Sequence, residues 1–255
     1  MIYRILLSLL ILAGLVLMPF SATALDLKDK ELLLYLPFNE GKGKAAEDLS
    51  PHGNDGELNG DAGWTDGKFG KAMEFTEKGE VKSPYIELNE KSFTVTMWVK
   101  PALSGGDQQC VFTQTQVNAQ NTSLHYRIYN SGTVRMGFYG NDLDAPAAVK
   151  ADKWAHITFW LDVKGKSRQI YIDGKSVAED AGKAGIEYLG TAGDTIVGSW
   201  GNTGQRFNGV IDEVTVWDRA LSEDDIARSM EDLTALPVDP ADKLATTWAS
   251  VKAWR

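Results

Sequence analysis

The chain has 255 residues, of which 43% are hydrophobic and 24% are charged, and its formal net charge is −9 at pH 7. An acidic surface repels phosphate backbones, so the composition argues against a nucleic-acid partner. Cys110 is the only cysteine, which excludes an intramolecular disulfide and predicts a small, buried, apolar residue. A chain of this length can bury one hydrophobic core as a single all-β domain.

Residues 1–24 have the order of features of a secretory signal peptide. Arg4 is the only charge in this segment, an apolar run over 5–18 follows it, and Ala22-Thr23-Ala24 supplies the small residues that signal peptidase recognises. We expect cleavage after Ala24 and a secreted protein, extracellular or periplasmic, with no stable membrane insertion after cleavage. The alternative is an uncleaved anchor, although the run is shorter than the roughly 20 residues of a spanning helix.

Most of the remaining sequence alternates between apolar and polar residues with a period of two, which is typical of β-strands. Over Ser92–Lys100, for example, Val95 and Met97 share one face and Thr96 and Trp98 the other. The segments with strand character are 32–36, 72–75, 85–88, 92–100, 110–113, 124–129, 134–139, 154–163, 169–172, 195–197 and 210–217. So many short strands predict an all-β fold, a two-sheet antiparallel β-sandwich.

The turns and one short helix support this architecture. Asn130-Ser131-Gly132 and Asp173-Gly174 separate pairs of strand segments, and both contain residues that tolerate the positive φ of tight hairpins. Helical character appears only near the end of the domain. Ser222 is expected to cap a short helix that continues to about Leu233, because acidic residues fill the first turn after it.

Residues 234–255 are expected to form a linker and an amphipathic C-terminal tail. Asp239 can cap a helix that has Pro240 in its first turn, and Leu244, Trp248 and Val251 would then share one face. A lone helix of this length is marginal in water. It could pack on the sandwich, dock on a partner or stay disordered, and we expect docking on a partner or disorder.

Three groups of motifs follow one another along the chain. They are Leu36-Pro37-Phe38-Asn39-Glu40-Gly41 with Asp48-Leu49-Ser50, then Phe93–Pro101 with Ile170–Gly174, and last Phe207–Val214 with Arg219–Ser222. In this order and spacing they resemble the laminin-G-like, concanavalin A-like jelly rolls of bacterial secreted proteins. The resemblance covers about residues 31–233 and implies one jelly-roll domain over 25–233. It also implies a carbohydrate- or protein-binding module, with one Ca²⁺ ion at the rim where the first strand ends beside the last.

Oxygen donors gather in the segment that would hold such an ion. Calcium takes about six to eight oxygen ligands, and Asp48, Ser50, His52 and Asn54 alternate before a turn at Gly56, although the imidazole of His52 is a poor calcium ligand. The resemblance adds the strand carboxylate Asp212 and the amide of Asn39. The predicted metal ligands are therefore Asp212, Asp48, Asn54 and Asn39. The alternative is a set of Asx-turns with one salt bridge and no metal.

The sequence lacks a recognisable catalytic pattern. Glycosidases need two carboxylates facing one cleft, roughly 5–9 Å apart. Asp212 and Glu213 are adjacent in a strand, so their side chains are expected to point to opposite faces. The three histidines, His52, His125 and His156, do not have metal-ligand spacing. We therefore predict that the chain is not an enzyme.

Exposed aromatic rings flanked by polar groups are the residues that bind sugars, because the C–H face of a sugar is apolar and its hydroxyls are not. Trp200, with Asn202 in the same glycine-rich loop, is the main predicted ligand contact. The alternative position for Trp200 is folded back over the edge of the sandwich. Tyr139, Asn141 and Asp142 form a second group, and Tyr126–Arg127 a third.

These residues predict a secreted, non-catalytic, glycan-binding module with a structural calcium ion. The alternatives are an adhesive or structural extracellular protein that engages a protein partner and, less favoured, a glycoside hydrolase.

Overall fold

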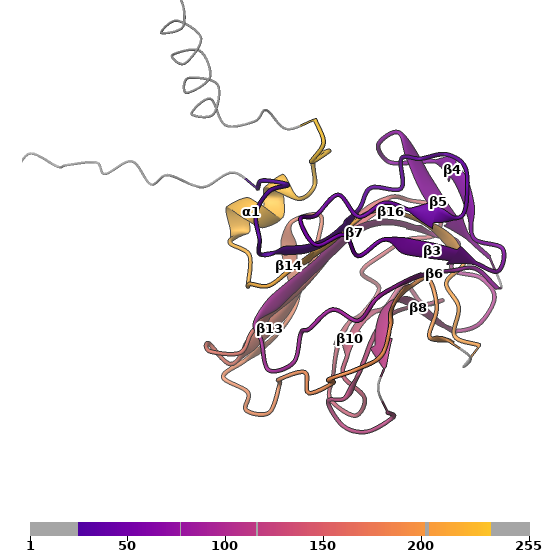
Figure 1. The fold of residues 1–255 in the computed structure, drawn as a ribbon. Helices are drawn as coiled ribbons and strands as arrows, with labels where there is room; N and C mark the ends of the chain where they lie inside the picture. Colours follow the sequence, from indigo (N-terminus) through magenta and orange to yellow (C-terminus); the bar gives the residue numbers. More distant parts are fainter. Residues whose placement is uncertain (1–24, 77, 116, 202–203, 236–255) are drawn as a thin grey trace, which may run out of the picture.

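Two antiparallel β-sheets pack face to face in the computed structural model, which describes residues 25–76, 78–115, 117–201 and 204–235 (Figure 1). This confirms the predicted all-β sandwich. The predicted signal peptide over 1–24 and the amphipathic segment of the tail, 236–255, lie outside the described residues. No helix among the described residues is long and apolar enough to cross a membrane.

Within each sheet, several strands that are neighbours in space are not consecutive in the sequence. Sheet A runs β14 (Lys175–Ala181), β13 (Ser167–Ile172), β12 (Ala155–Asp162), β7 (Phe93–Pro101), β16 (Gly209–Trp217), β5 (Lys71–Phe75) and β4 (Gly63–Asp66), and β1 (Leu32–Leu36) pairs with the second half of β16. Sheet B runs β11 (Asp142–Ala145), β10 (Val134–Gly137), β9 (Ser123–Tyr129), β8 (Gln108–Thr115), β15 (Thr195–Val197), β6 (Glu80–Ser83), β3 (Gly56–Asn59) and β2 (Ala45–Ala46).

The core lies between the sheets, and the period-two pattern identifies its residues correctly. Val95 and Met97 of β7 are fully buried in the main hydrophobic cluster, and Cys110 is also buried. The expected strand at 85–88 is wrong: Ile86 and Leu88 enter the core from an irregular segment, and Glu80–Ser83 forms β6 instead. The sequence pattern also missed β2, β3, β4 and β11, because strands of two to four residues are too short to show a period of two.

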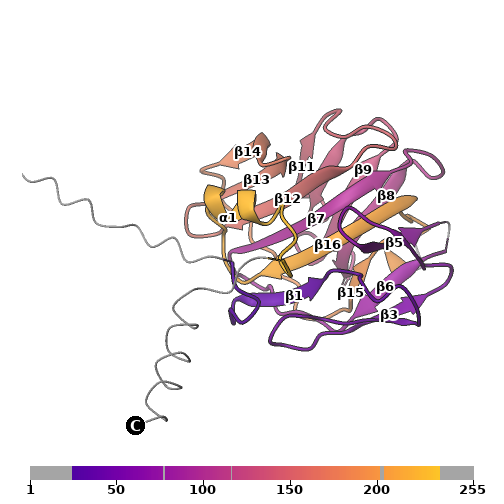
Figure 2. The same cartoon turned by 90° about the horizontal axis from the view of Figure 1, so that it is seen from above.

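A second apolar cluster covers the outer face of sheet A. Helix α1 (Glu223–Arg228) is capped as predicted, since the backbone N–H of Asp225 donates to Ser222 Oγ at 3.1 Å. The helix lies against sheet A (Figure 2) and ends well before Leu233, which still belongs to the apolar cluster. The residues of this cluster are Leu25, Leu32, Tyr35, Tyr171, Trp217, Leu221, Ile226 and Leu233.

A β-bulge in β16 changes the direction of one acidic side chain. Asp212 pairs with Trp98 and Thr215 with Thr96, so two residues of β16, Glu213 and Val214, oppose only one residue of β7. Glu213 is the extra residue and has φ +54°. Asp212 and Glu213 therefore both lie on the outer side of sheet A, and the expectation that they face opposite ways is wrong. The alternation rule fails here because an inserted residue shifts the register.

Both carboxyl groups are buried on that side. The hydroxyl of Tyr35 donates to Glu213 Oε2 at 2.5 Å, whereas Oε1 of Glu213 has no partner among the described residues. Burial raises the pKa of Glu213 to about 8 and that of Asp212 to about 7. The folded protein therefore holds protons that the unfolded chain releases near pH 4, and these protons stabilise the fold only under acidic to neutral conditions.

The substitution Glu213→Gln should flatten the pH dependence of stability. The contribution of the Glu213 proton is present in full below its ordinary pKa of 4.5 and is lost as the pH rises through about 8. Each pH unit of this range lowers the free energy of unfolding by up to about 1.4 kcal/mol. Urea unfolding from pH 5 to pH 9 measures this, and the difference should be clearest above pH 7, where Asp212 has already ionised. The exposed Glu57→Gln is the control, and a wild-type profile in Glu213→Gln would contradict the assignment.

Candidate binding site

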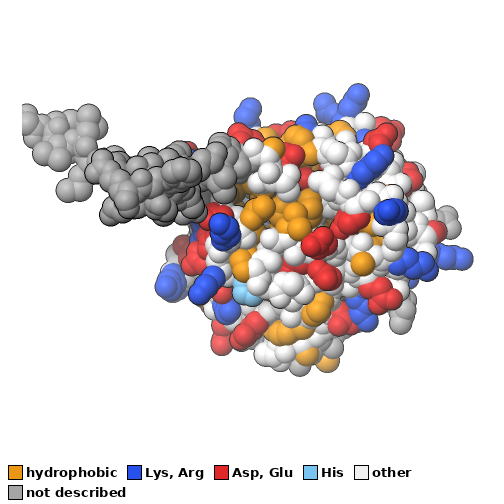
Figure 3. Space-filling model, turned by 45° about the horizontal axis from the view of Figure 1, so that its top comes forward, with side chains coloured by type: hydrophobic (Ala, Val, Ile, Leu, Met, Phe, Trp, Pro, Cys, Tyr) orange, Lys and Arg blue, Asp and Glu red, His pale blue; other side chains and the backbone are white. Residues whose placement is uncertain are grey.

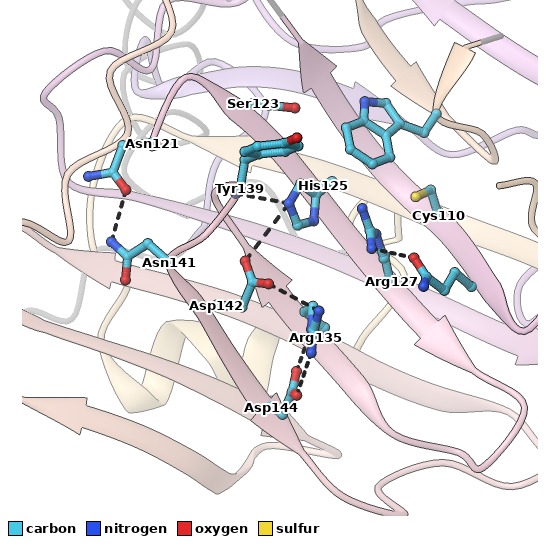
Figure 4. Close-up of polar contacts among 12 residues, drawn as sticks. Cys110, Asn121, Ser123, His125, Arg127, Arg135, Tyr139, Asn141, Asp142 and Asp144 are labelled. Atoms are coloured by element: carbon cyan, nitrogen blue, oxygen red, sulfur yellow. Dashed lines mark hydrogen bonds and ion pairs between the residues drawn. The ribbon is translucent and has the colours of Figure 1, made fainter. Parts of the chain in front are cut away.

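The outer face of sheet B carries a row of charged and aromatic side chains. Leu124, Tyr126 and Ile128 of β9 point into the core, so His125 and Arg127 point outward. The strand register places Arg127 between Cys110 of β8 and Arg135 of β10. Arg135 in turn lies opposite Asp144 of β11. Figure 4 shows how these side chains lie across the four strands.

Trp200 folds back onto this face. The indole is only 7% exposed, and its Nε1 donates to Thr115 Oγ1 at 2.6 Å. Its ring lies 5.0 Å from the His125 ring, measured between centroids, and the guanidinium carbon of Arg127 lies 4.6 Å from its centroid. Of the two positions that the sequence left open for Trp200, the structure has the folded-back one, in which the ring joins β8 and β9 to the loop.

His125 is neutral in this setting. The backbone N–H of Tyr139 donates to His125 Nε2 at 2.9 Å, so the proton of the neutral ring is on Nδ1. Burial and the positive charge of Arg127 lower the pKa of His125 to about 3. Nδ1 has no partner among the described residues. The ring therefore presents an N–H donor rather than a charge.

Arg135 holds the two carboxylates of β11. Its Nε and Nη2 donate to Asp144 at 2.7 and 2.8 Å, and its Nη1 lies 3.0 Å from Asp142 Oδ2 (Figure 4). These pairs raise the pKa of Arg135 above its ordinary value, first through the hydrogen bond with Asp144. The three side chains form a fixed, partly exposed polar group at one edge of the row.

An open pocket lies beside Trp200. It has a volume of about 340 Å³, and its lining is formed by Thr113, Thr115, Asn118, Gly193, Asp194, Ile196, Trp200 and Gly201. Tyr139 is 38% exposed nearby, in the turn between β10 and β11, and its ring centroid lies 6.4 Å from that of Trp200. We name Trp200, His125, Arg127, Tyr139 and this pocket the sheet B site.

The structure brings together part of the predicted ligand set. Trp200, Tyr139 and Asp142 meet at the sheet B site, whereas Asn202 lies outside the described residues. Asn141 is buried and holds neighbouring segments together, because its Nδ2 donates to Asn121 Oδ1 and Gly185 O, and its Oδ1 accepts from Arg168.

Sequence reasoning missed His125, Arg135 and Asp144, and it grouped Tyr126 with Arg127. Tyr126 is fully buried in the core, so that pairing is wrong. The alternation of apolar and polar residues along β9 could have identified the correct group of binding residues, because it places His125 and Arg127 together on the polar face. The hairpin turn at Asn130–Gly132 predicts that β9 pairs with β10, whereas β11 was not recognised as a strand and its link to this row comes from the structure.

The predicted calcium ligands form two separate groups. Asp48 accepts four hydrogen bonds, from the backbone N–H groups of Tyr35, Ser50 and Asn54 and from Ser50 Oγ. Asp212 accepts from the backbone N–H groups of Lys68, Phe69 and Glu213.

Asn39 accepts from the N–H of Lys71 in the same turn that Asp212 holds. The oxygens of these side chains face N–H and O–H donors, an arrangement that does not fit a cation. Among the described residues, no group of three or more His, Cys, Asp or Glu side chains is placed to hold a metal ion. Calcium binding stays a prediction of the sequence, and it would require these donors to move away.

Comparison with known proteins identifies the family. A laminin-G-like family model described as the concanavalin A-like lectin/glucanases superfamily matches residues 75–227. The chain belongs to this family. This match confirms the family that the sequence motifs predicted. No curated protein matches it.

Several solved structures share the fold. Domain 4 of AbnA, a GH43 extracellular arabinanase from Geobacillus stearothermophilus solved in complex with arabinotriose, is similar over 79% of this chain and 98% of its own, with 18% identity and a TM-score of 0.62. The binding domain of Paraclostridial Mosquitocidal Protein 1 is similar over 79% of this chain and 52% of its own, with 19% identity and a TM-score of 0.62. The chain thus spans about half of that second domain, and at these identities the similarity shows the fold alone.

Asp48→Ala should destabilise the protein with or without calcium. The substitution leaves several buried donors unpaired, which typically costs about 2–4 kcal/mol of unfolding free energy. Thermal unfolding in millimolar Ca²⁺ and in chelator measures the loss, which we expect to be equal in both. Asp107→Ala, an exposed carboxylate in a loop, is the control. A rise in wild-type Tm on adding Ca²⁺ that Asp48→Ala or Asp212→Ala abolishes would instead support the calcium prediction.

Proposed function

We propose that this protein is a secreted, non-catalytic module that binds a glycan at the sheet B site. The observation that carries the proposal is the meeting of two aromatic rings, Tyr139 and Trp200, with charged and amide groups beside an open pocket. Secretion rests on the signal-peptide pattern of residues 1–24.

The chemistry of the site suits a sugar. The exposed ring of Tyr139 offers an apolar surface for the C–H face of a pyranose or furanose ring. Hydroxyl groups need donors and acceptors in fixed positions, and the partly exposed Asp142 and Arg135, with Asn118 and Asp194 at the pocket, supply them. A pocket of about 340 Å³ is in the range that holds small ligands.

The arrangement of carboxylates supports binding rather than hydrolysis. Asp212 and Glu213 lie on one side of sheet A but are fully buried there, so a substrate does not reach them. Asp142 and Asp144 both form ion pairs with Arg135, whereas a glycosidase needs one carboxylic acid that keeps its proton. The fold itself also occurs in a domain solved with bound arabinotriose, which is consistent with this proposal.

The substitution Tyr139→Ala should weaken glycan binding without unfolding the protein, because the ring is partly exposed and lies in a turn. Loss of one stacking ring typically costs about 1–2 kcal/mol, roughly five- to thirtyfold in Kd. A glycan array identifies ligands, and calorimetry on the best one compares the variants. Trp154→Ala, which removes a partly buried ring on sheet A, is the control and should bind like wild type. Equal affinity in Tyr139→Ala and wild type would place the ligand elsewhere.

A further inference from the structure

Arg127 is a buried cation that has no carboxylate partner in the described part of the chain. The side chain is 6% exposed, and its Nη1 donates to the neutral Oε1 of Gln108 at 2.6 Å. Its Nε has no acceptor, and no hydrogen bond joins its Nη2 to a carboxylate or carbonyl of another described residue. A buried guanidinium is costly without a counter-charge and acceptors for its donors.

Two other arginines of the domain, Arg135 of β10 and Arg168 of β13, show how the Nε–Nη2 edge of a guanidinium is paired when a carboxylate is present. Arg135 donates from Nε and Nη2 to Asp144, at 2.7 and 2.8 Å. Arg168 donates from the same two atoms to Asp180, at 2.9 and 2.6 Å. In both side chains one carboxylate fills the Nε–Nη2 edge, in the planar fork geometry that matches two oxygens. In Arg127 the Nε of the equivalent edge is buried and has no acceptor among the described residues.

The groups around Arg127 do not replace the missing anion. Cys110, its cross-strand neighbour, is a thiol whose pKa burial raises to about 12 in spite of the nearby guanidinium, so it carries no charge at neutral pH. The other cross-strand neighbour is Arg135, a like charge. Trp200 contacts the guanidinium over its ring. A carboxylate binds in the plane of a guanidinium, so this contact and a bound carboxylate are compatible.

The geometry points to the Nε–Nη2 edge of Arg127 as the subsite for the carboxylate of an acidic sugar, a uronic or a sialic acid. The inference rests on the proposed glycan-binding function and specifies its ligand. The sugar ring would lie toward Tyr139 and the pocket, while its carboxylate pairs with Arg127.

The test compares acidic sugars with their neutral derivatives on the full mature chain. Calorimetry with an oligogalacturonate and with its methyl ester isolates the carboxylate, and a sialylated trisaccharide and its methyl ester test the second source. Loss of a charge-assisted, two-point contact costs about 1.5–3 kcal/mol, which is roughly 10–150-fold in affinity. We expect at least one free acid to bind tenfold or more tightly than its ester.

Two variants assign the effect to Arg127. Arg127→Gln should remove the preference for the acid over the ester, and Arg127→Lys, which keeps the charge but not the fork, should retain only part of it. Lys91→Gln is the matched control, since it removes one positive charge from a partly exposed pair with Asp218, neither residue of which lines the pocket, and should leave the preference intact. The acid–ester comparison on the wild-type protein does not depend on whether a variant folds.

The outcomes separate the inference from the proposed function. If neutral glycans bind in a Tyr139-dependent way but no acid is preferred over its ester, the Arg127 subsite is wrong and the glycan-binding function stands. If a sulfated oligosaccharide binds and neither carboxylated sugar does, the assignment to a carboxylate is overturned. If no glycan of any kind binds, the proposed function fails together with the subsite.

Discussion

The face-to-face packing of the two sheets determines the rest of this structure. Tyr126 of sheet B stacks on Phe159 of sheet A with ring centroids 4.0 Å apart, and Phe112 and Phe138 flank Tyr126 on its own sheet. Each of these rings is fully buried. Because side chains alternate along a strand, burying one face commits the neighbouring residues to the outside. The sheet B site consists of those neighbours: His125 and Arg127 flank Tyr126 in the sequence.

The outer face of sheet A is covered by other parts of the chain, whereas the outer face of sheet B carries a pocket. The outer face of sheet A is covered by the cluster around Trp217, to which both Leu25 and Leu233 contribute, so the described chain begins and ends on that side (Figures 1 and 2). Figure 3 shows one face of the molecule, with acidic and basic side chains interspersed rather than gathered into one basic patch. The outer face of sheet B keeps its pocket and its row of arginines. A ligand bound there would lie on the opposite side of the sandwich from Leu25 and Leu233.

Buried polar groups mark both outer faces, and they have different explanations. At sheet A, Asp212 and Asp48 each accept hydrogen bonds from several backbone N–H groups, so their buried oxygens have partners inside the protein. Glu213 keeps its proton through burial. On sheet B, Arg127 lacks such compensation, although Arg135 and Arg168 nearby have it. Unpaired buried donors cost stability, and proteins keep such costs mainly where function requires them. This contrast makes Arg127 the residue on which the ligand class depends.

The sequence by itself determined the fold class, the core faces of the long strands and the cap of α1. These features depend on local patterns, and Val95, Met97 and Ser222 behave as those patterns predict. The motifs also identified the family. The tertiary structure alone decided which residues meet. The bulge at Glu213 turned a side chain that alternation had placed on the other face. The pairing of β9 with β10 and β11 brought Arg127, Arg135 and Asp144 into one row, and the loop after β15 folded Trp200 over it. The contact of Trp200 with Arg127 joins residues far apart in the chain, and a local pattern carries no information about such contacts.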